Sequence, residues 1–155
     1  MTMHIFARAV RSSVLAAAVA FALAAPALAV DQGSSSPEDT TSGLMTGRQL
    51  INAGDYAGAV QALKPVIGAN ANNADALNLM GFALRKSGDI PHALGFYRRA
   101  LSVNPNHRGA NEYLGELYVE TGEIDLARER LAELERICGN TTCEEYEDLA
   151  EAIGN

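Results

Sequence analysis

Apolar residues between positions 74 and 107 recur three or four residues apart, in two runs separated by the polar turn residues Gly88 and Asp89. The first run contains Leu77, Met80, Gly81 and Leu84, and the second contains Ala93, Tyr97 and Ala100. This spacing places each run on one face of an α-helix. Pro105 predicts the end of the second helix. The segment is therefore predicted to form two amphipathic helices joined by a tight turn.

The same pattern recurs once upstream and once downstream, at one fixed interval. Two columns of glycine carry it most clearly, and they contain Gly47, Gly81 and Gly115 in one column and Gly54, Gly88 and Gly122 in the other. Scattered glycines rarely fall into two columns at one fixed period. A period of about 34 residues is typical of an array of stacked helix–turn–helix repeats.

These residues resemble the tetratricopeptide repeat family. The resemblance implies an all-α fold, a right-handed α-solenoid of three helix–turn–helix repeats followed by a capping helix. It places the repeats at about residues 40–73, 74–107 and 108–141, and the domain that they form at residues 43–155. In the family, small residues such as Gly81 and Ala93 let the paired helices approach closely. Large substitutions there are expected to overpack the contact.

The first and third repeats depart from the family pattern. The first helix of the first repeat is expected near Leu44–Asn52, with Asp55 capping the second helix. Pro65 removes a backbone donor from that second helix, so we expect a kink or an early end there. The third repeat has Asn111 where a large residue is usual and Gly139 where a proline is usual.

The residues after the third repeat predict one further helix over residues 142–153. Thr142 and Glu145 have the spacing of a capping box, in which each side chain satisfies a backbone donor at the start of the helix. An apolar stripe follows, made of Tyr146, Leu149, Ala150 and Ile153. Because a repeat array needs an end with one apolar and one polar face, we interpret this helix as a cap.

Residues 1–29 have the features of a cleaved signal peptide. Arg8 and Arg11 precede an apolar run, Val14–Leu23, that is short for a membrane anchor. Small residues at alternate positions predict cleavage between Ala29 and Val30; an uncleaved anchor is the alternative. We expect a periplasmic protein that is not inserted in the membrane after cleavage. Residues 30–42, rich in serine, threonine and acidic residues, are expected to form a flexible linker.

The excess negative charge lies in the last third of the chain. Removing two arginines with the signal peptide leaves 10 basic and 19 acidic residues, a net charge of −9. Residues 108–155 contain 13 of these acids and four of the bases. Nucleic acid and anionic lipid need a basic surface, so neither is expected as a partner. The acidity serves either solubility or docking.

The two cysteines, Cys138 and Cys143, lie between the third repeat and the predicted cap. An even number of cysteines in an exported protein favours a disulfide; a pair of buried reduced thiols is the alternative. A redox-active pair is less favoured because the spacing is not that of the Cys-x-x-Cys motif. No metal site is expected, because no histidine or third cysteine lies nearby in the sequence.

No pattern of catalytic residues is apparent. His92 and His107 are expected to be solvated surface residues, since neither has a partner at a spacing that indicates a triad or a metal site. The glycines at helix ends occur singly and do not form a phosphate-binding loop. We therefore expect neither an enzyme nor a bound cofactor.

In arrays of the family that this chain resembles, the first helix of each repeat lines a concave groove. The groove positions fall on Leu44, Arg48 and Ile51, on Asn78, Phe82 and Arg85, and on Glu112, Glu116 and Val119. Phe82 either anchors a side chain of a bound peptide or packs against a neighbouring helix or the N-terminal linker. In the first case, Asn78 would pair with the peptide backbone and Arg85 with a carboxylate.

Three hypotheses for the function follow. The first is a protein-interaction scaffold or assembly factor that binds a segment of another exported or membrane-anchored protein in the groove. The second is a structural module that assembles with copies of itself. The third is a redox-active accessory protein that uses Cys138 and Cys143, which predicts an accessible and easily reduced bridge.

Overall fold

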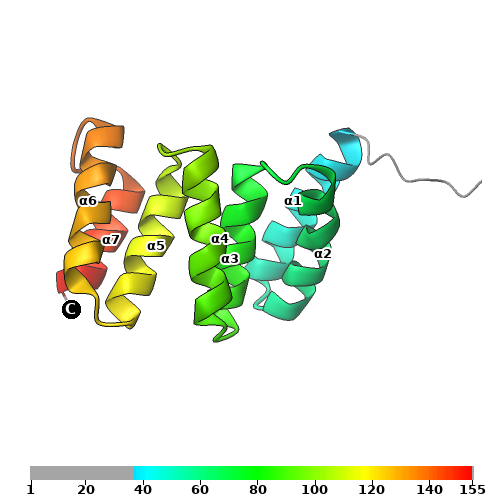
Figure 1. Cartoon of the computed structure of the whole chain (residues 1–155), viewed down its shortest axis with the longest axis horizontal. Helices are drawn as coiled ribbons and strands as arrows, with labels where there is room; N and C mark the ends of the chain where they lie inside the picture. Colours follow the sequence, from blue (N-terminus) through cyan, green and yellow to red (C-terminus); the bar gives the residue numbers. More distant parts are fainter. Residues whose placement is uncertain (1–36, 155) are drawn as a thin grey trace, which may run out of the picture. The chain divides into compact units, whose positions relative to one another are not determined.

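The computed structural model describes residues 37–154, and those residues form α-helices joined by short turns, with no strand among them (Figure 1). The helices are α1 (Pro37–Asn52), α2 (Tyr56–Ala69), α3 (Ala74–Lys86), α4 (Ile90–Val103), α5 (Arg108–Glu120), α6 (Ile124–Cys138) and α7 (Glu144–Gly154). None of these helices combines the length and the hydropathy required to cross a membrane. The predicted signal peptide and its cleavage site at Ala29 and Val30 lie outside the described residues.

Consecutive helices pack as antiparallel pairs, and the pairs lie side by side. α1 packs on α2, α3 on α4, and α5 on α6, while α2 touches α3 and α4 touches α5. Figure 1 shows the three helix pairs in sequence order along the long axis, with α7 next to α5 and α6. This arrangement is an all-α helical repeat solenoid, and it confirms the predicted fold class.

The turn inside each pair contains a glycine in the left-handed region. Gly54, Gly88 and Gly122 have φ angles of 77°, 84° and 82°. The residue after each glycine donates its backbone N–H to the preceding helix: Asp55 to Leu50, Asp89 to Leu84 and Glu123 to Tyr118, at 2.7 to 2.9 Å. This is the hydrogen bond of a Schellman motif, in which a residue without a Cβ is preferred. The second glycine column therefore ends the first helix of each repeat, as predicted.

The first glycine column marks where helices approach most closely. A Cβ on Gly47 would lie 2.7 Å from the Leu63 side chain, and a Cβ on Gly81 would lie 2.7 Å from the Tyr97 ring. Leu63 and Tyr97 are fully buried, so neither can move aside easily. These contacts confirm that glycine is needed here for packing.

The third glycine of the column contacts the cap instead of its own repeat partner. The atoms nearest to a Cβ on Gly115 all belong to Leu149 of α7. Leu149 is fully buried, and it follows Gly115 at the same interval that separates the glycines of the column. Position 149 is therefore the fourth member of the column, occupied by leucine.

His107 caps α5, which corrects the expectation of a solvated histidine. Its Nδ1 accepts a hydrogen bond from the backbone N–H of Ala110 (3.1 Å), so its Nε2 carries the proton and donates to Asp75 Oδ1 (3.2 Å). The side chain is only 14% exposed. The N-termini of α2, α3 and α4 are capped by side-chain oxygens of Asp55, Asn73 and Asp89. At the N-terminus of α5 the imidazole nitrogen of His107 takes the same acceptor role. His92 is solvated as expected.

The first helix starts earlier than the sequence indicated. α1 begins at Pro37, so residues 37–42 are helical and not part of a flexible linker. Proline is favoured in the first turn of a helix, where its missing N–H has no partner to lose. Glu38 and Asp39 lie in the first turn of α1, where their negative charges interact favourably with the positive end of the helix dipole. The remaining predicted linker residues lie outside the described part of the chain.

Two departures from the family pattern are accommodated without ending a helix. α2 continues through Pro65 to Ala69, so the early end expected there is wrong. Pro65 is exposed, while Leu63 and Val66 beside it are buried; their packing offsets the lost hydrogen bond. Asn111 is fully buried, donates to the carbonyls of Pro105 and His107, and accepts from Arg130 (3.2 Å). A fully bonded amide thus replaces the usual large residue.

The start of the capping helix also differs from the prediction. α7 begins at Glu144, and in the described part of the chain Thr142 and Glu145 do not form the reciprocal bonds of a capping box. Asn140 follows the left-handed Gly139, and its Oδ1 accepts from the Thr142 N–H (2.9 Å) and hydroxyl (3.0 Å). This local turn competes with the capping box for the Thr142 side chain.

The predicted disulfide between Cys138 and Cys143 is present. The Cα atoms are 6.3 Å apart, within the range that a disulfide spans. Cys138 is the last residue of α6, and Cys143 directly precedes α7. The bridge therefore fixes the connection between the last repeat and the capping helix.

We predict that Gly81→Ala lowers the free energy of unfolding by about 1–3 kcal/mol, because the added methyl group overlaps the immobile Tyr97 ring. Urea denaturation monitored by circular dichroism measures this change. Gly95→Ala is the control, because Gly95 lies inside α4 with no atom within 4 Å of an added Cβ. It should stabilise the protein by up to about 1 kcal/mol through helix propensity. Equal stability of the two variants would refute the close-contact argument.

We predict that replacing both Cys138 and Cys143 by alanine lowers the free energy of unfolding by about 2 kcal/mol, the value expected for a short loop. Hydrogen exchange should increase mainly in α7, since the bridge is local. Wild-type protein treated with a reductant should reach the stability of the double variant. A wild-type protein that is unchanged by complete reduction would show that the bridge contributes nothing.

Candidate functional site

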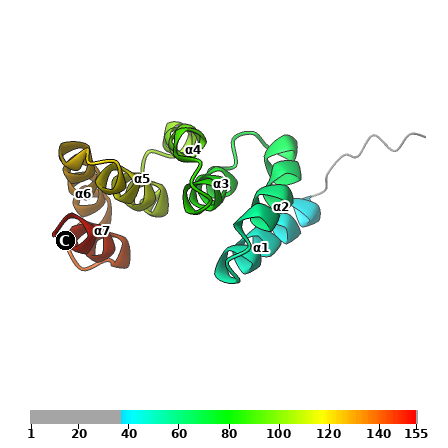
Figure 2. The same cartoon turned by 90° about the horizontal axis from the view of Figure 1, so that it is seen from below.

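Two adjoining depressions lie along one side of the row of helices, where α1, α3, α5 and α7 contribute side chains. Figure 2 shows α1 and α7 on the same side of the row, opposite α4. The first depression, here called the polar cleft, has a volume of about 540 Å³ and lies between α1, α3, α5 and α7. The second, here called the apolar hollow after the side chains of Ile51, Leu79 and Phe82, has a volume of about 210 Å³. Tyr113 and two polar residues, Arg48 and Asn52, complete its lining. Arg48, Leu79 and Tyr113 line both, so the two form one continuous groove.

The apolar hollow contains the predicted residues Ile51 and Phe82. The Phe82 ring lies 4.8 Å from the Tyr113 ring and 6.4 Å from the Tyr56 ring, measured between centroids. Phe82 is half-buried, so part of its ring packs on neighbouring helices while part lines the hollow. The packing expected as the alternative is therefore present, while part of the ring is left to line the hollow. Its aromatic neighbours fix the ring in place, which favours it as a rigid contact surface.

Arg85 has a different role from the one expected. Its side chain is only 2% exposed, and its guanidinium pairs with Glu116 and with Glu120 (2.7 Å). The guanidinium also lies 5.4 Å from the Phe82 centroid and 5.8 Å from the Tyr113 centroid. Because Glu116 and Glu120 already form ion pairs with the guanidinium, Arg85 is not free to bind a ligand carboxylate. It joins α3 to α5 beneath the aromatic residues.

The polar cleft contains two buried polar side chains, Asn78 and Glu112. Asn78 is 6% exposed, and its Oδ1 accepts no hydrogen bond from any described group. Glu112 is 7% exposed. Burial, followed by the negative charges of Glu116, Asp148 and Glu145, raises the pKa of Glu112 to about 8, while Arg85 opposes the shift. Glu112 therefore holds a proton at neutral pH while the cleft is empty.

The cleft is mainly acidic. Its lining includes the carboxylates of Asp75, Glu112, Glu144, Glu145 and Asp148, and the guanidinium groups of Arg48 and Arg108. Arg108 pairs with Glu145 (3.3 Å), and Arg48 approaches Asp75 (4.0 Å). Among the described residues, no basic side chain lies within ion-pairing distance of Glu112, Glu144 or Asp148. The cleft therefore has unbalanced negative charge.

The other residues predicted for the groove are divided between lining and packing. Arg48 is exposed and lines both depressions, as a groove residue should. Glu116 is bound to Arg85. Leu44 and Val119 pack against the buried clusters around Leu63 and Leu117, and neither depression includes them.

Sequence reasoning missed Leu79, Tyr113 and the acidic residues of α7. Leu79 and Tyr113 are separated by the same interval as the glycines of one column, so a search of every repeat column, and not only the family positions, could have found them. On α7 the same period would place Tyr146 and Ala150 toward the groove. Instead Glu144, Glu145 and Asp148 line the polar cleft. α7 packs on both α5 and α6 and has a different orientation from that of a first helix of a repeat.

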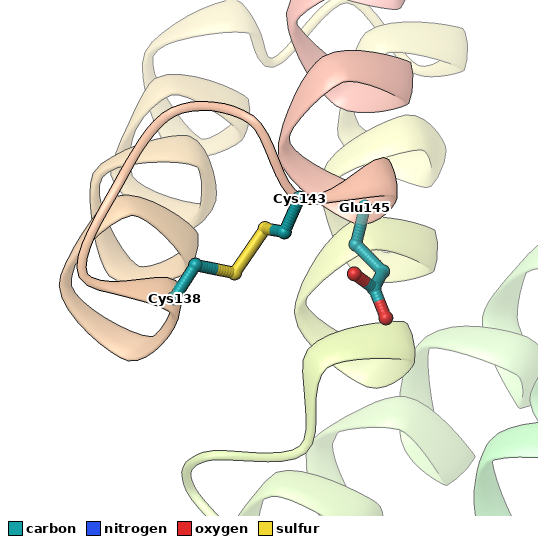
Figure 3. A group of neighbouring side chains, drawn as sticks. All are labelled: Cys138, Cys143 and Glu145. Atoms are coloured by element: carbon teal, nitrogen blue, oxygen red, sulfur yellow. A yellow bond between two sulfur atoms is a disulfide. The ribbon is translucent and has the colours of Figure 1, made fainter.

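The disulfide lies close to Glu145 (Figure 3), which lines the polar cleft. The sulfur atoms of Cys138 and Cys143 and a carboxylate oxygen of Glu145 all lie within 4.8 Å of one another. A metal ion would need thiolates, but these sulfurs are bonded to each other, and Glu145 pairs with Arg108. The group is therefore a structural bridge next to the cleft in this oxidised form.

Comparison with known proteins connects this geometry to a family. One tetratricopeptide repeat profile matches residues 84–152, and a second matches residues 44–102. The two matches together span every helix pair and most of α7. A search of curated proteins finds no significant sequence match.

Solved structures agree with the profiles. The tetratricopeptide repeat domain of Sgt2 from Aspergillus fumigatus is similar with a TM-score of 0.69 and 18% identity, over 77% of this chain and 78% of that chain. The TPR2B domain of yeast Sti1, in a complex with pHsp70, has a TM-score of 0.67 and 19% identity, over 76% of this chain and 97% of that chain. MamA has a TM-score of 0.64 and 23% identity, over 76% of this chain and 68% of that chain. These identities are low, so the likeness concerns the fold. On the profiles and the repeat architecture together, the chain belongs to the tetratricopeptide repeat family.

Proposed function

We propose that this protein is a non-enzymatic scaffold or assembly factor that binds a peptide segment of another protein in the groove. The observation that carries the proposal is the apolar hollow, in which Phe82 and Tyr113 present aromatic surface beside a polar cleft. A peptide can insert an apolar side chain into such a hollow while polar groups orient the rest. Domains of this family are protein-interaction modules, and similar structures include the Sti1 TPR2AB complex with pHSP90 and the CopN–Scc3 complex.

The proposed partner is another exported or membrane-anchored protein in the periplasm. Two features support this location. Residues 1–29 have the features of a signal peptide, and a disulfide at Cys138 and Cys143 persists most readily in an oxidising compartment. A redox-active role for the bridge is less well supported, because its spacing differs from that of dithiol oxidoreductases.

We predict that Phe82→Ala weakens capture of the partner at least about tenfold, because it removes an anchoring surface from the apolar hollow. The purified protein is immobilised, exposed to an extract of the native periplasm, and the retained proteins are quantified by mass spectrometry. Phe96→Ala is the matched control: Phe96 is also half-buried, but it lies on α4 and lines neither depression.

A partner lost with Phe82→Ala and kept with Phe96→Ala supports binding in the groove. Both variants must first show wild-type circular dichroism at the assay temperature, since each loses core contacts. If every captured protein is retained equally by the wild type and Phe82→Ala, the groove is not the binding site.

We predict that the exported protein begins at Val30, because Ala27 and Ala29 supply the small side chains that signal peptidase requires. Osmotic-shock fractionation followed by intact-mass measurement tests this. Ala29→Arg should leave the precursor uncleaved, while Ala29→Gly should be processed normally. A full-length wild-type protein that remains in the cytoplasmic fraction would contradict the proposed location.

A further inference from the structure

The two arginines of the polar cleft do not balance the negative charge of its carboxylates. Arg48 and Arg108 lie against Asp75 and Glu145. Glu112, Glu144 and Asp148 line the same space without a described cationic partner. Like charges gathered in a partly enclosed site repel one another and attract a cation from outside.

A second observation, independent of the acids, indicates a hydrogen-bond donor as the missing ligand group. Asn78 lines the cleft and is 6% exposed, yet its Oδ1 has no hydrogen-bond partner among the described residues. Its Nδ2 lies beside Gly109, also in the cleft lining, at 3.2 Å from where a Cβ on Gly109 would be. A buried acceptor left unpaired is costly, and a ligand N–H would remove that cost.

The position of the cleft beside the apolar hollow indicates that the cation belongs to a side chain of a bound peptide. The cleft shares Leu79, Tyr113 and Arg48 with the apolar hollow, so one extended chain can occupy both. An ammonium or guanidinium group carries several donors and a positive charge. Such a group can pair with the carboxylates, and it can donate to the Asn78 oxygen when the amide turns that atom toward the cleft.

Resting on the peptide-binding function proposed above, we propose that the partner segment inserts a lysine or arginine side chain into the polar cleft and a neighbouring apolar side chain into the apolar hollow. The recognised motif is therefore basic and apolar. Phe82 and Tyr113 contact the apolar residue, while Glu112, Asp148 and Asn78 contact the cation.

Glu112 should make this binding dependent on pH. It is protonated at neutral pH in the empty cleft, because its pKa is about 8. The charged groups that face it are Glu116, Glu145 and Asp148, which raise its pKa, and Arg85, which lowers it; Asp75, His107, Arg48, Arg108 and Glu144 line the same cleft. A bound cation favours the carboxylate form, so Glu112 releases its proton on binding. Affinity therefore rises with pH up to about 8, the pKa of Glu112 in the empty cleft, and is level above that value.

The test begins with a displayed library of random short peptides, selected on the purified wild-type protein. We expect the selected peptides to contain lysine or arginine next to an apolar residue. Affinities of one selected peptide and its acetyl-lysine or citrulline counterpart are then measured by fluorescence anisotropy. Loss of the positive charge should weaken binding at least about tenfold.

Matched variants on one helix separate the cleft from general acidity. Glu144→Gln combined with Asp148→Asn should weaken the basic peptide at least about tenfold. Glu147→Gln combined with Glu151→Gln removes the same charge from exposed positions of α7 outside the cleft, and it should change affinity less than about threefold. Glu112→Gln should abolish the rise in affinity between pH about 6.5 and about 9, a range in which lysine remains charged.

The outcomes distinguish this inference from the function on which it rests. Selected peptides that need Phe82 but show no basic preference, or that bind the two double variants equally, overturn the basic motif and leave groove binding intact. If no selected peptide depends on Phe82, groove binding itself fails, and the inference fails with it. A basic preference lost only in the Glu144 and Asp148 variant establishes the proposed recognition.

Discussion

The close contact between paired helices at the first glycine column is the constraint on which the rest of the structure depends. Gly47 and Gly81 leave the volume that Leu63 and Tyr97 fill. Tyr97 is fully buried, so close packing holds its ring in place. Because close-packed helices cannot shift without opening cavities, the side chains on their groove-facing surfaces stay at set positions. The groove is thus formed before any ligand arrives.

The groove concentrates groups that cost stability. Arg85 is buried with two carboxylate partners and an unpaired Nε, and Glu112 is buried among carboxylates. Burying such groups is unfavourable unless they are fully paired. The apolar contacts of the helix pairs offset this cost. Incompletely paired polar groups are common at functional sites. Here Glu112 lines the polar cleft, and Arg85 lies against the Phe82 ring at the apolar hollow.

The fold could be predicted from the sequence because its signals are local and repeated. The two glycine columns and the helical spacing of Leu77, Tyr97 and Ala100 each describe a contact between neighbouring elements. The site was less predictable, because its properties depend on contacts between repeats. The period places Arg85 on the groove side but cannot show that Glu116 and Glu120 bind it. Likewise, the composition shows an acidic C-terminal third, but only the orientation of α7 shows that Asp148 lines a cleft.

Leu149 determines how the array can be continued. A second helix packs on α3 because Gly81 leaves room for Tyr97, and position 149 is where the interval of the column next falls in the sequence. A buried leucine occupies it and is used to cover Gly115. α7 therefore cannot receive another helix in the way that α3 receives α4. In this column a leucine thus fills, between α5 and α7, the kind of space that glycine leaves open for the second helix in the first two pairs.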